Sequence, residues 1–248
     1  MYEIVIRKGK EKILVRHNPW VFTGAIKKVS PSFTDAGLAE VLSEDGQFIA
    51  YGWYDEKSHI TLHLLSWNRR IIPDEGWLEE RINDAVRRRK VLASSEDTDA
   101  MRLIHGEADF IPGLALDIYN GHLKAIISSR YAQDHLDVIR NALQKAVDYK
   151  TLTIIPDSFY APSEGLSRRI LSFDRDGNSI ENGKENIRFR ESGIYYEIEP
   201  GISQKSGFYC DQRDNRNIVE KYANGRTVLD ACSFTGAFTL HCLRGRAE

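Results

Sequence analysis

Val228-Leu-Asp-Ala-Cys-Ser-Phe-Thr-Gly-Ala-Phe-Thr-Leu240 is the segment around which the rest of this chain is organised. Its apolar start predicts a buried strand over residues 227–229, and a short polar turn then leads into a helix that opens near Gly236. This order places backbone N–H groups beside the carboxyl end of a parallel strand, where α/β sheets bind nucleotide-like ligands. Asp230 is expected to order the loop or to accept a hydrogen bond from a ligand amine. A single glycine is not a GxGxxG motif, so an ordinary strand-to-helix turn remains the alternative.

Three further features, in collinear order, carry a resemblance to a known family. They are Arg16-His-Asn-Pro-Trp-Val-Phe-Thr-Gly-Ala-Ile26, Arg102-Leu-Ile-His-Gly-Glu-Ala-Asp109 with Pro112-Gly113, and Lys205-Ser-Gly-Phe-Tyr-Cys-Asp-Gln-Arg-Asp214 just before the opening segment. With these motifs the chain resembles the ribosomal RNA large-subunit cytosine-C5 methyltransferases, S-adenosylmethionine (SAM)-dependent enzymes in which a PUA domain precedes the catalytic domain. The resemblance covers essentially all 248 residues.

The resemblance implies a fold of class α/β plus β in three parts. Residues 1–72 would form a PUA-like, RNA-binding β-barrel, and residues 73–185 a central mixed α/β linking domain. Residues 186–248 would be the beginning of a Rossmann-like SAM methyltransferase domain. The implied function is methyl transfer from SAM to ribosomal RNA at cytosine C5.

One departure from the family pattern affects the expected chemistry. The chain stops at Glu248, just after the first strand and helix of the catalytic domain. In the family, the cysteine nucleophile and an Asp-Pro-Pro loop lie further downstream, so the catalytic residues are expected beyond Glu248. If the polypeptide is complete, it should bind SAM weakly and catalyse nothing. Its strand at 227–229 would carry an unpaired edge, so residues after about 226 should be poorly ordered or covered by another chain.

The resemblance also assigns binding residues. The residues placed at or near the cofactor are Lys205, Phe208, Tyr209, Gln212, Arg213, Asp230, Ser233, Thr235, Gly236 and Phe238. The residues that could form an RNA-facing surface of the barrel are Arg16, His17, Trp20, Lys27 and Lys28. For the aromatic residues a structural role stays open: Phe208, Tyr209 and Phe238 can pack in a core, and Pro19, Trp20 and Phe22 can plug the barrel.

Composition limits the remaining choices. Hydrophobic residues make up 42% of the chain and the formal net charge is −2, so a nucleic-acid surface must be a local patch. No apolar run reaches about 18 residues, which argues against a membrane span. Three cysteines without CxxC spacing argue against disulfides and zinc and indicate the cytoplasm.

Periodicity predicts the individual elements. Strands are expected over 2–7, 12–16, 38–42, 48–51, 59–65 and 151–155, β-hairpins around Asn120-Gly121 and Ser192-Gly193, and helices over 74–92, 132–148 and from about 214 to Asn224-Gly225. Asp74 is the expected N-cap of the first helix. The run Arg87-Arg-Arg-Lys90 is expected to close that helix in water, with an RNA-phosphate contact as the alternative.

Two groups of residues invite a catalytic or metal-binding interpretation that we do not favour. His105, Glu107 and Asp109 alternate along one stretch, but a turn in which Arg102 pairs with a carboxylate explains them better than a metal site. Cys232 and Cys242 are expected to be small, buried and inert.

Two other functions remain as alternatives. One is a non-catalytic RNA-binding module. The other is a Rossmann oxidoreductase, which the lone glycine and its late position disfavour. The enzymatic assignment depends on a parallel strand at Thr227, and the sequence leaves a homodimer open.

Overall fold

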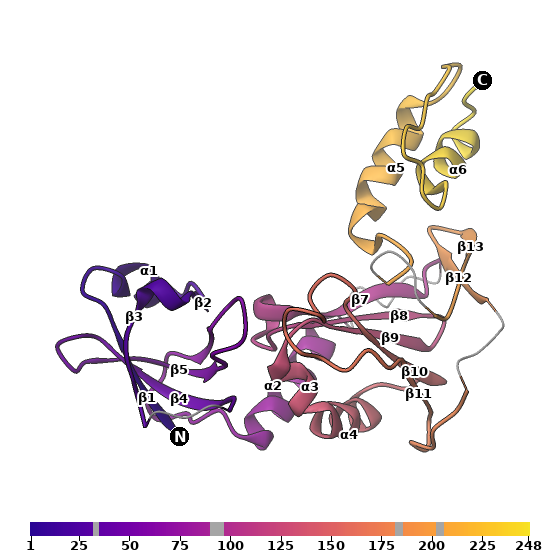
Figure 1. Cartoon of the computed structure of the whole chain (residues 1–248). Coiled ribbons are helices and arrows are strands. Elements are labelled where there is room, and N and C mark those ends of the chain that lie inside the picture. Colours follow the sequence, from indigo (N-terminus) through magenta and orange to yellow (C-terminus); the bar gives the residue numbers. More distant parts are fainter. Residues whose placement is uncertain (32–34, 90–96, 182–185, 202–205) are drawn as a thin grey trace.

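The structure, a computed structural model, describes residues 1–31, 35–89, 97–181, 186–201 and 206–248. Figure 1 shows three parts along the chain: a curled sheet at the N-terminal end, a second sheet with helices along one side, and a helical lobe that projects away from both. Three separate hydrophobic clusters form the cores of the first sheet, the second sheet and the hairpin beneath the lobe.

The first sheet is six-stranded. Its strands are β1 (Tyr2–Ile6), β2 (Trp20–Val21), β3 (Ile26–Ser30), β4 (Gly37–Leu42), β5 (Phe48–Tyr54) and β6 (Leu62–Ser66). They lie in the order β2-β6-β5-β4-β1-β3. The short helix η1 (Thr23–Ala25) joins β2 to β3, which lie at opposite edges. Because so short a link spans the two edges, the sheet must curl toward a barrel around buried Ile4, Val41 and Leu64.

One predicted strand of this part is wrong. Residues 12–16 do not pair with the sheet, and the short helix α1 (Glu11–Val15) occupies the position instead. Only Leu14 of this segment is buried, whereas Ile13 and Val15 are exposed. A short apolar run does not by itself distinguish a strand from a helix turn, which explains the error.

The second sheet is mixed. It contains β7 (Ala100–His105), β8 (Leu114–Tyr119), β9 (His122–Ile127), β10 (Thr151–Pro156) and β11 (Leu171–Asp174), in the order β11-β10-β9-β8-β7. Only the β9–β10 pair is parallel, and α3 (Arg130–Asp134) and α4 (Leu136–Ala146) form its crossover. The hairpin predicted at Asn120-Gly121 is confirmed: Tyr119 pairs with His122, and both turn residues have positive φ.

The helices on this sheet differ from the prediction in two details. The helix expected over 132–148 is interrupted at His135, so α3 and α4 are separate. Helix α2 (Glu75–Arg89) begins as predicted, with the Asp74 carboxylate accepting from the Trp77 N–H at 2.8 Å. The basic end of α2 is not simply in water, because Arg88 and Arg89 both bind the buried carboxylate of Asp109. Lys90 lies outside the described residues.

Gly113, at the start of β8, has a backbone that only glycine tolerates well. Its φ is +72°, and a Cβ there would lie 2.6 Å from the Ser129 backbone nitrogen. We expect Gly113→Ala to lower the unfolding free energy by roughly 2–5 kcal/mol, because left-handed strain adds to the steric clash. Urea denaturation measures this loss.

Gly165→Ala is the matched control, since its φ is +63° but no atom lies within 4 Å of a built Cβ. Its unfolding free energy should fall only by the cost of left-handed strain in the backbone, about 1–2 kcal/mol. Equal losses of unfolding free energy in the two variants would contradict the steric clash proposed at Gly113.

The C-terminal lobe stands on a two-stranded hairpin, β12 (Ile187–Glu191) and β13 (Ile194–Ile198), which forms as predicted across Ser192-Gly193. The lobe itself consists of η4 (Cys210–Gln212), α5 (Arg213–Tyr222) and α6 (Ala237–Arg244). The Glu220 carboxylate of α5 binds the Arg244 guanidinium and the His241 ring of α6, which joins the two helices.

The parallel strand predicted at 227–229 is absent, so this segment no longer supports the enzymatic assignment that depended on it. Residues 226–230 pair with no strand among the described residues, and Leu229 is 91% exposed. A strand forms only when a neighbour completes its hydrogen bonds, so the segment stays irregular here. The polar turn and the helix after it do form, and α6 packs against α5.

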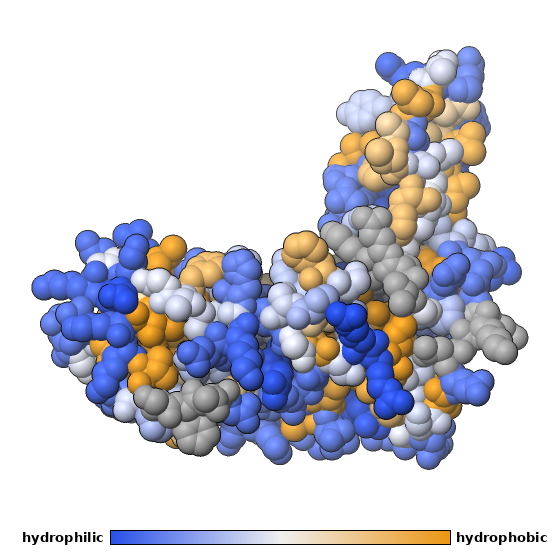
Figure 2. Space-filling view, in the orientation of Figure 1, coloured by the Kyte–Doolittle hydropathy of each residue, from blue (hydrophilic) through white to orange (hydrophobic). Residues whose placement is uncertain are grey.

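The lobe exposes much of its apolar surface. Figure 2 shows hydrophobic residues gathered along it. The large apolar residues exposed there are Ile218, Val219, Tyr222, Val228, Leu229, Phe234, Leu240 and Leu243. Ile218, Val219 and Tyr222 share one face of α5, as the sequence predicts, but that face is not buried. Among the described residues, no helix is long and apolar enough to cross a membrane.

Candidate cofactor and RNA sites

A cavity of about 370 Å³ lies between the loop that precedes α6 and the start of α5. The loop contributes Asp230, Ser233, Phe234 and Thr235, and α6 contributes Ala237 and Phe238. From the other side come Tyr209, Gln212 and Arg216. The Tyr209 and Phe234 rings meet edge to face, with centroids 5.5 Å apart. The cavity thus combines three aromatic side chains with a carboxylate, an amide and hydroxyl groups.

The loop is held in an unusual conformation. Cys232, Phe234 and Gly236 all have positive φ, and two of these three residues carry a side chain. Such conformations cost about 1–3 kcal/mol each and gather at ligand sites. Asp230 stabilises the loop, because its carboxylate accepts from the backbone N–H of Thr239 at 3.1 Å and from its hydroxyl at 2.7 Å. Asp230 therefore performs the first of its two expected roles, ordering the loop.

Arg216 also lines this cavity, and the sequence did not predict it there. It is 2% exposed and donates to the buried Glu191 carboxylate from Nε at 2.9 Å and from Nη2 at 2.5 Å. Its guanidinium also lies over the Phe208 ring, 4.6 Å from the centroid. An arginine on the polar helix α5 gives no sequence signal for burial, since its partner is 25 residues away in β12.

The cavity gathers six of the ten predicted cofactor residues: Tyr209, Gln212, Asp230, Ser233, Thr235 and Phe238. Gly236 lies between them as the N-cap of α6. Phe208 is instead 2% exposed and packs on Phe189 and Tyr196, the structural role that the sequence left open. Arg213 turns toward Glu191 and the Ala100 carbonyl. Lys205 lies outside the described residues.

The cysteines separate into three environments. Cys242 is buried, as expected, and burial raises the pKa of its thiol. Cys232 is exposed and lines the cavity, so the prediction that it is buried was wrong. Cys210 approaches the Tyr119 hydroxyl at 3.9 Å, and burial raises the pKa of its thiol to about 12.

The predicted RNA-facing residues do not gather at one place. Trp20 is 45% exposed and lines a cavity between the first and second sheets, so it is not a plug of the barrel. His17 lines a different cavity, and its ring meets the Trp67 ring at a tilt of 42°, with centroids 4.8 Å apart. Arg16, Lys27 and Lys28 are exposed, and Lys27 pairs with Glu44 at 2.6 Å.

The three acidic or imidazole side chains of 105–109 each have a different partner. Asp109 binds Arg88 and Arg89, Glu107 faces His63, and the His105 ring contacts Arg102. Arg102 pairs with the Asp117 carboxylate through two N–H groups, so it has the carboxylate partner that was predicted, but that partner lies across the sheet in β8 and not in the turn. Within the part of the chain that the structure describes, no group of three such side chains is arranged to hold a metal ion.

Comparison with known proteins supports the fold in two steps. Residues 4–67 match the model of a PUA-like domain family. Over its whole length the chain has the fold of a protein from Streptococcus mutans assigned as a SAM-dependent methyltransferase, with a TM-score of 0.80, 19% identity, and coverage of 100% of this chain and 61% of that one. A second solved structure is of a protein assigned as a methyltransferase and complexed with S-adenosylhomocysteine (SAH). It gives a TM-score of 0.81 at 19% identity and the same coverage. The class defined by fold is therefore a PUA-like domain joined to a SAM methyltransferase fold.

Particular curated relatives are similar at the sequence level. The chain is 31% identical over 251 residues to a ribosomal RNA large subunit methyltransferase I of Tolumonas auensis, covering 99% of this chain and 61% of the relative. It is 30% identical over 249 residues to the protein of that name in Photobacterium profundum, with the same coverage. A ribosomal RNA large subunit methyltransferase of Deinococcus radiodurans is 31% identical over 254 residues, covering 98% of this chain and 60% of the relative. The chain thus spans about three fifths of the length of these relatives.

Proposed function

We propose that this chain carries the RNA-binding part and the first cofactor motif of a SAM-dependent methyltransferase that acts on ribosomal RNA at cytosine C5. The observation that carries the proposal is the cavity of about 370 Å³, which gathers six residues predicted to hold the cofactor. The names of the relatives and the PUA-like domain support ribosomal RNA as the partner. With that substrate, the protein would act in the cytoplasm.

The residues present suit the proposed cofactor. A volume of about 370 Å³ is within the usual range of ligand pockets, roughly 300–1,000 Å³. The faces of Tyr209, Phe234 and Phe238 offer surfaces for an adenine ring or a sulfonium cation. When bound, SAM supplies an electrophilic methyl group, and the task of the protein is to hold the donor in place and to exclude water. The fixed loop at Asp230 serves that positioning.

The methyl acceptor requires a group that these residues do not supply. Cytosine C5 becomes nucleophilic when a thiolate adds to C6 of the ring. Cys210 is unsuited to this, because a thiol with a pKa near 12 stays protonated at neutral pH. Cys242 is buried. We therefore propose that the 248 residues alone bind the cofactor and RNA without completing methyl transfer.

Calorimetric titration with SAH tests the cofactor site. We expect saturable binding, weakened roughly 3- to 10-fold in Phe238→Ala, the worth of one aromatic contact. Phe159→Ala is the control, since Phe159 is 79% exposed and lies outside the cavity. Absence of binding by the unmodified chain would contradict the cofactor assignment.

Mass spectrometry of ribosomal RNA from cells with and without the full-length gene tests the substrate. A methyl group on cytosine C5 that disappears with the gene is the expected result, and loss of a different modification would contradict the assignment. The alternative is a non-catalytic RNA-binding module, to which the match of residues 4–67 to a PUA-like domain points on its own. It predicts RNA binding without SAH binding and no change in methylation.

Light scattering of the RNA complex tests the homodimer.

A further inference from the structure

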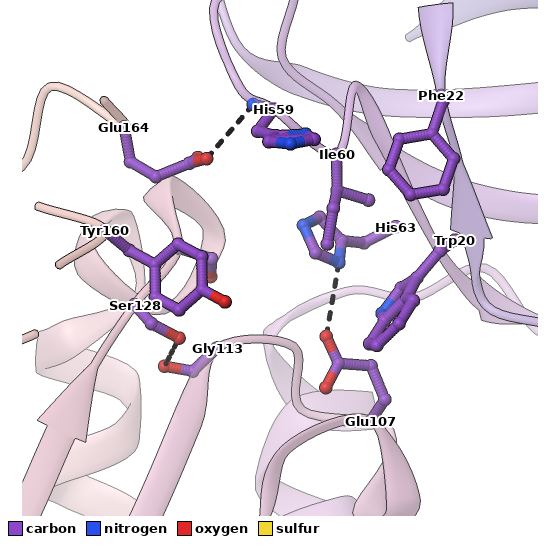
Figure 3. Close-up of a pocket in the computed structure, with 11 residues that line it drawn as sticks. Trp20, Phe22, His59, Ile60, His63, Glu107, Gly113, Ser128, Tyr160 and Glu164 are labelled. Atoms are coloured by element: carbon purple, nitrogen blue, oxygen red, sulfur yellow. Dashed lines mark hydrogen bonds and ion pairs between the residues drawn. The ribbon is translucent and has the colours of Figure 1, made fainter. Parts of the chain in front are cut away.

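A second cavity, of about 380 Å³, lies where the first sheet meets the second. Trp20 and Phe22 line it from the end of β2, and His59, Ile60 and His63 from the approach to β6 and the strand itself. From the loops and short helix beside the second sheet come Glu107, Gly113, Ser128, Ser129, Tyr160 and Glu164. Figure 3 shows Tyr160 and Glu164 facing Trp20, Phe22 and His63 across the open space. No lining residue is shared with the cofactor cavity.

Aromatic faces form much of the wall. Trp20, Phe22 and Tyr160 are 45%, 47% and 43% exposed, although residues of this kind are usually buried. The Phe22 ring also meets the His59 ring edge to face, with centroids 5.8 Å apart. Exposed rings that converge on one cavity are suited to a flat apolar ligand that stacks on them.

Two carboxylates give the cavity its polarity. Glu164 is 6% exposed, and its Oε1 accepts from the His59 backbone N–H at 3.1 Å. Its Oε2 is buried and has no hydrogen-bond partner among the described residues. An unsatisfied buried carboxylate oxygen is costly, roughly 1–3 kcal/mol or more, so a ligand that donates a hydrogen bond would be favoured.

The second carboxylate is Glu107. Its Oε1 lies 3.4 Å from His63 Nδ1, too long or too poorly aligned to satisfy that buried nitrogen fully. Burial acts to raise the pKa of Glu107, but the His63 imidazole and the Trp20 indole outweigh it, and the net pKa is lowered. Glu107 is therefore ionised, and it lies beside His63 at the edge of the cavity.

We propose that this cavity binds one unpaired base of the RNA, a base with an exocyclic amino group and most favourably guanine. Single-stranded RNA is recognised by stacking bases on aromatic side chains and by hydrogen bonds to their Watson–Crick edges. A carboxylate accepts from amino groups, and guanine presents two adjacent donors, N1–H and the 2-amino group. Uracil presents one donor between two carbonyl oxygens, which a carboxylate repels. The inference rests on the proposed RNA-binding function.

The bound base would be an anchor rather than the methylated base. The cofactor cavity lies in the α5–α6 lobe, and the curled first sheet lies at the other end of the molecule (Figure 1). A base held beside Trp20 would fix the register of the RNA strand on the protein, while the target base is presented elsewhere.

Nonamer RNAs of the form UUUU-X-UUUU, with X as G, C, A or U, test the proposal by fluorescence anisotropy. We expect the G nonamer to bind at least about 10-fold more tightly than the U nonamer, the worth of a good base contact. Trp20→Ala should weaken G binding about 10-fold, the typical effect of losing one base-stacking ring. Tyr222→Ala, an exposed aromatic on α5, should bind like the unmodified chain.

Glu164→Gln is the sharpest variant. The amide oxygen still accepts from His59, but an NH₂ group replaces the unpartnered oxygen and donates where the carboxylate accepts. The affinity of this variant for the G nonamer should therefore fall, and its affinity for the U nonamer should rise relative to it. A melting temperature equal to that of the unmodified chain confirms that the variant folds.

Three results would overturn the proposal. Equal affinity for all four nonamers, with RNA still bound, would overturn it and leave the proposed function standing. Absence of any RNA binding would overturn both this proposal and the proposed RNA-binding function. Competition by tetramethylammonium in the unmodified chain but not in Glu164→Gln would show instead a cage for a cationic group.

Discussion

Replacing Glu191 with alanine should destabilise the C-terminal lobe by about 3–5 kcal/mol, the usual cost of leaving one member of a buried ion pair alone. Glu191 is fully buried and Arg216 is 2% exposed. Two N–H groups of Arg216 donate to Glu191 Oε1, and Arg213 lies 3.3 Å from Oε2. Without the carboxylate, the Arg216 charge would keep the Tyr209 carbonyl at 3.0 Å and the Phe208 ring, but no anionic partner among the described residues.

Hydrogen exchange of the α5 and α6 amides is the suitable measurement, because separate cores make a single global unfolding curve hard to interpret. Asp137→Ala is the control: the Asp137 side chain is 90% exposed and its pair with Arg140 is 3.3 Å long. That variant should change stability by less than about 1 kcal/mol. If Glu191→Ala exchanged no faster than Asp137→Ala, the anchoring role would be wrong. Because Arg216 also lines the cofactor cavity, Glu191→Ala should bind SAH more weakly.

Replacing Asp109 with alanine should cost a similar 3–5 kcal/mol in the central part of the chain. Asp109 is 2% exposed and accepts from Arg88 at 2.6 Å, from Arg89 at 2.7 and 2.8 Å, and from the His105 backbone N–H at 2.7 Å. This one carboxylate therefore joins the end of α2 to the turn after β7. Hydrogen exchange of the amides of α2 and of residues 105–109 at neutral pH measures the loss. An effect below about 1 kcal/mol would contradict the buried pairing.

The same carboxylate predicts a pH dependence. Burial raises the pKa of Asp109, but hydrogen bonds from Arg89, His105 and Arg88 outweigh it, so the folded-state pKa is lowered. Between that lowered pKa and the ordinary value near 3.9, the unfolded chain binds more protons than the folded chain. The stability from Asp109 is thus complete above about pH 4 and is lost as the pH falls toward the lowered pKa. Asp109→Asn should show a shallower fall in melting temperature below pH 4, and a parallel fall would refute this.

The sequence predicts the local structure where one residue type allows few backbone conformations. Asn120-Gly121 and Ser192-Gly193 both form two-residue hairpins, because positive φ at such positions favours asparagine and glycine. Asp74 caps α2 for the same local reason. The loop residues at Asp230 and Phe238 also meet in one cavity, since they are close in the chain.

The sequence fails where distant partners determine the outcome. Residues 227–229 have strand composition, but a strand needs a neighbour, and none of the described strands lies beside them. Arg89 and Arg216 have the pattern of surface charges in the sequence, but Asp109 and Glu191 bring them inward. Trp20 forms part of a cavity because the second sheet supplies its opposite wall, which no pattern within residues 16–26 reveals.

We propose that the loop before α6 holds SAM. Irradiation of the chain with methyl-tritiated SAM, followed by tryptic digestion, tests this directly, because cleavage at Arg226 and Arg244 releases the loop and α6 as one peptide. We expect most of the label in residues 227–244, and we expect excess SAH to remove it. Label confined to peptides outside residues 206–244, or label unaffected by SAH, would contradict it.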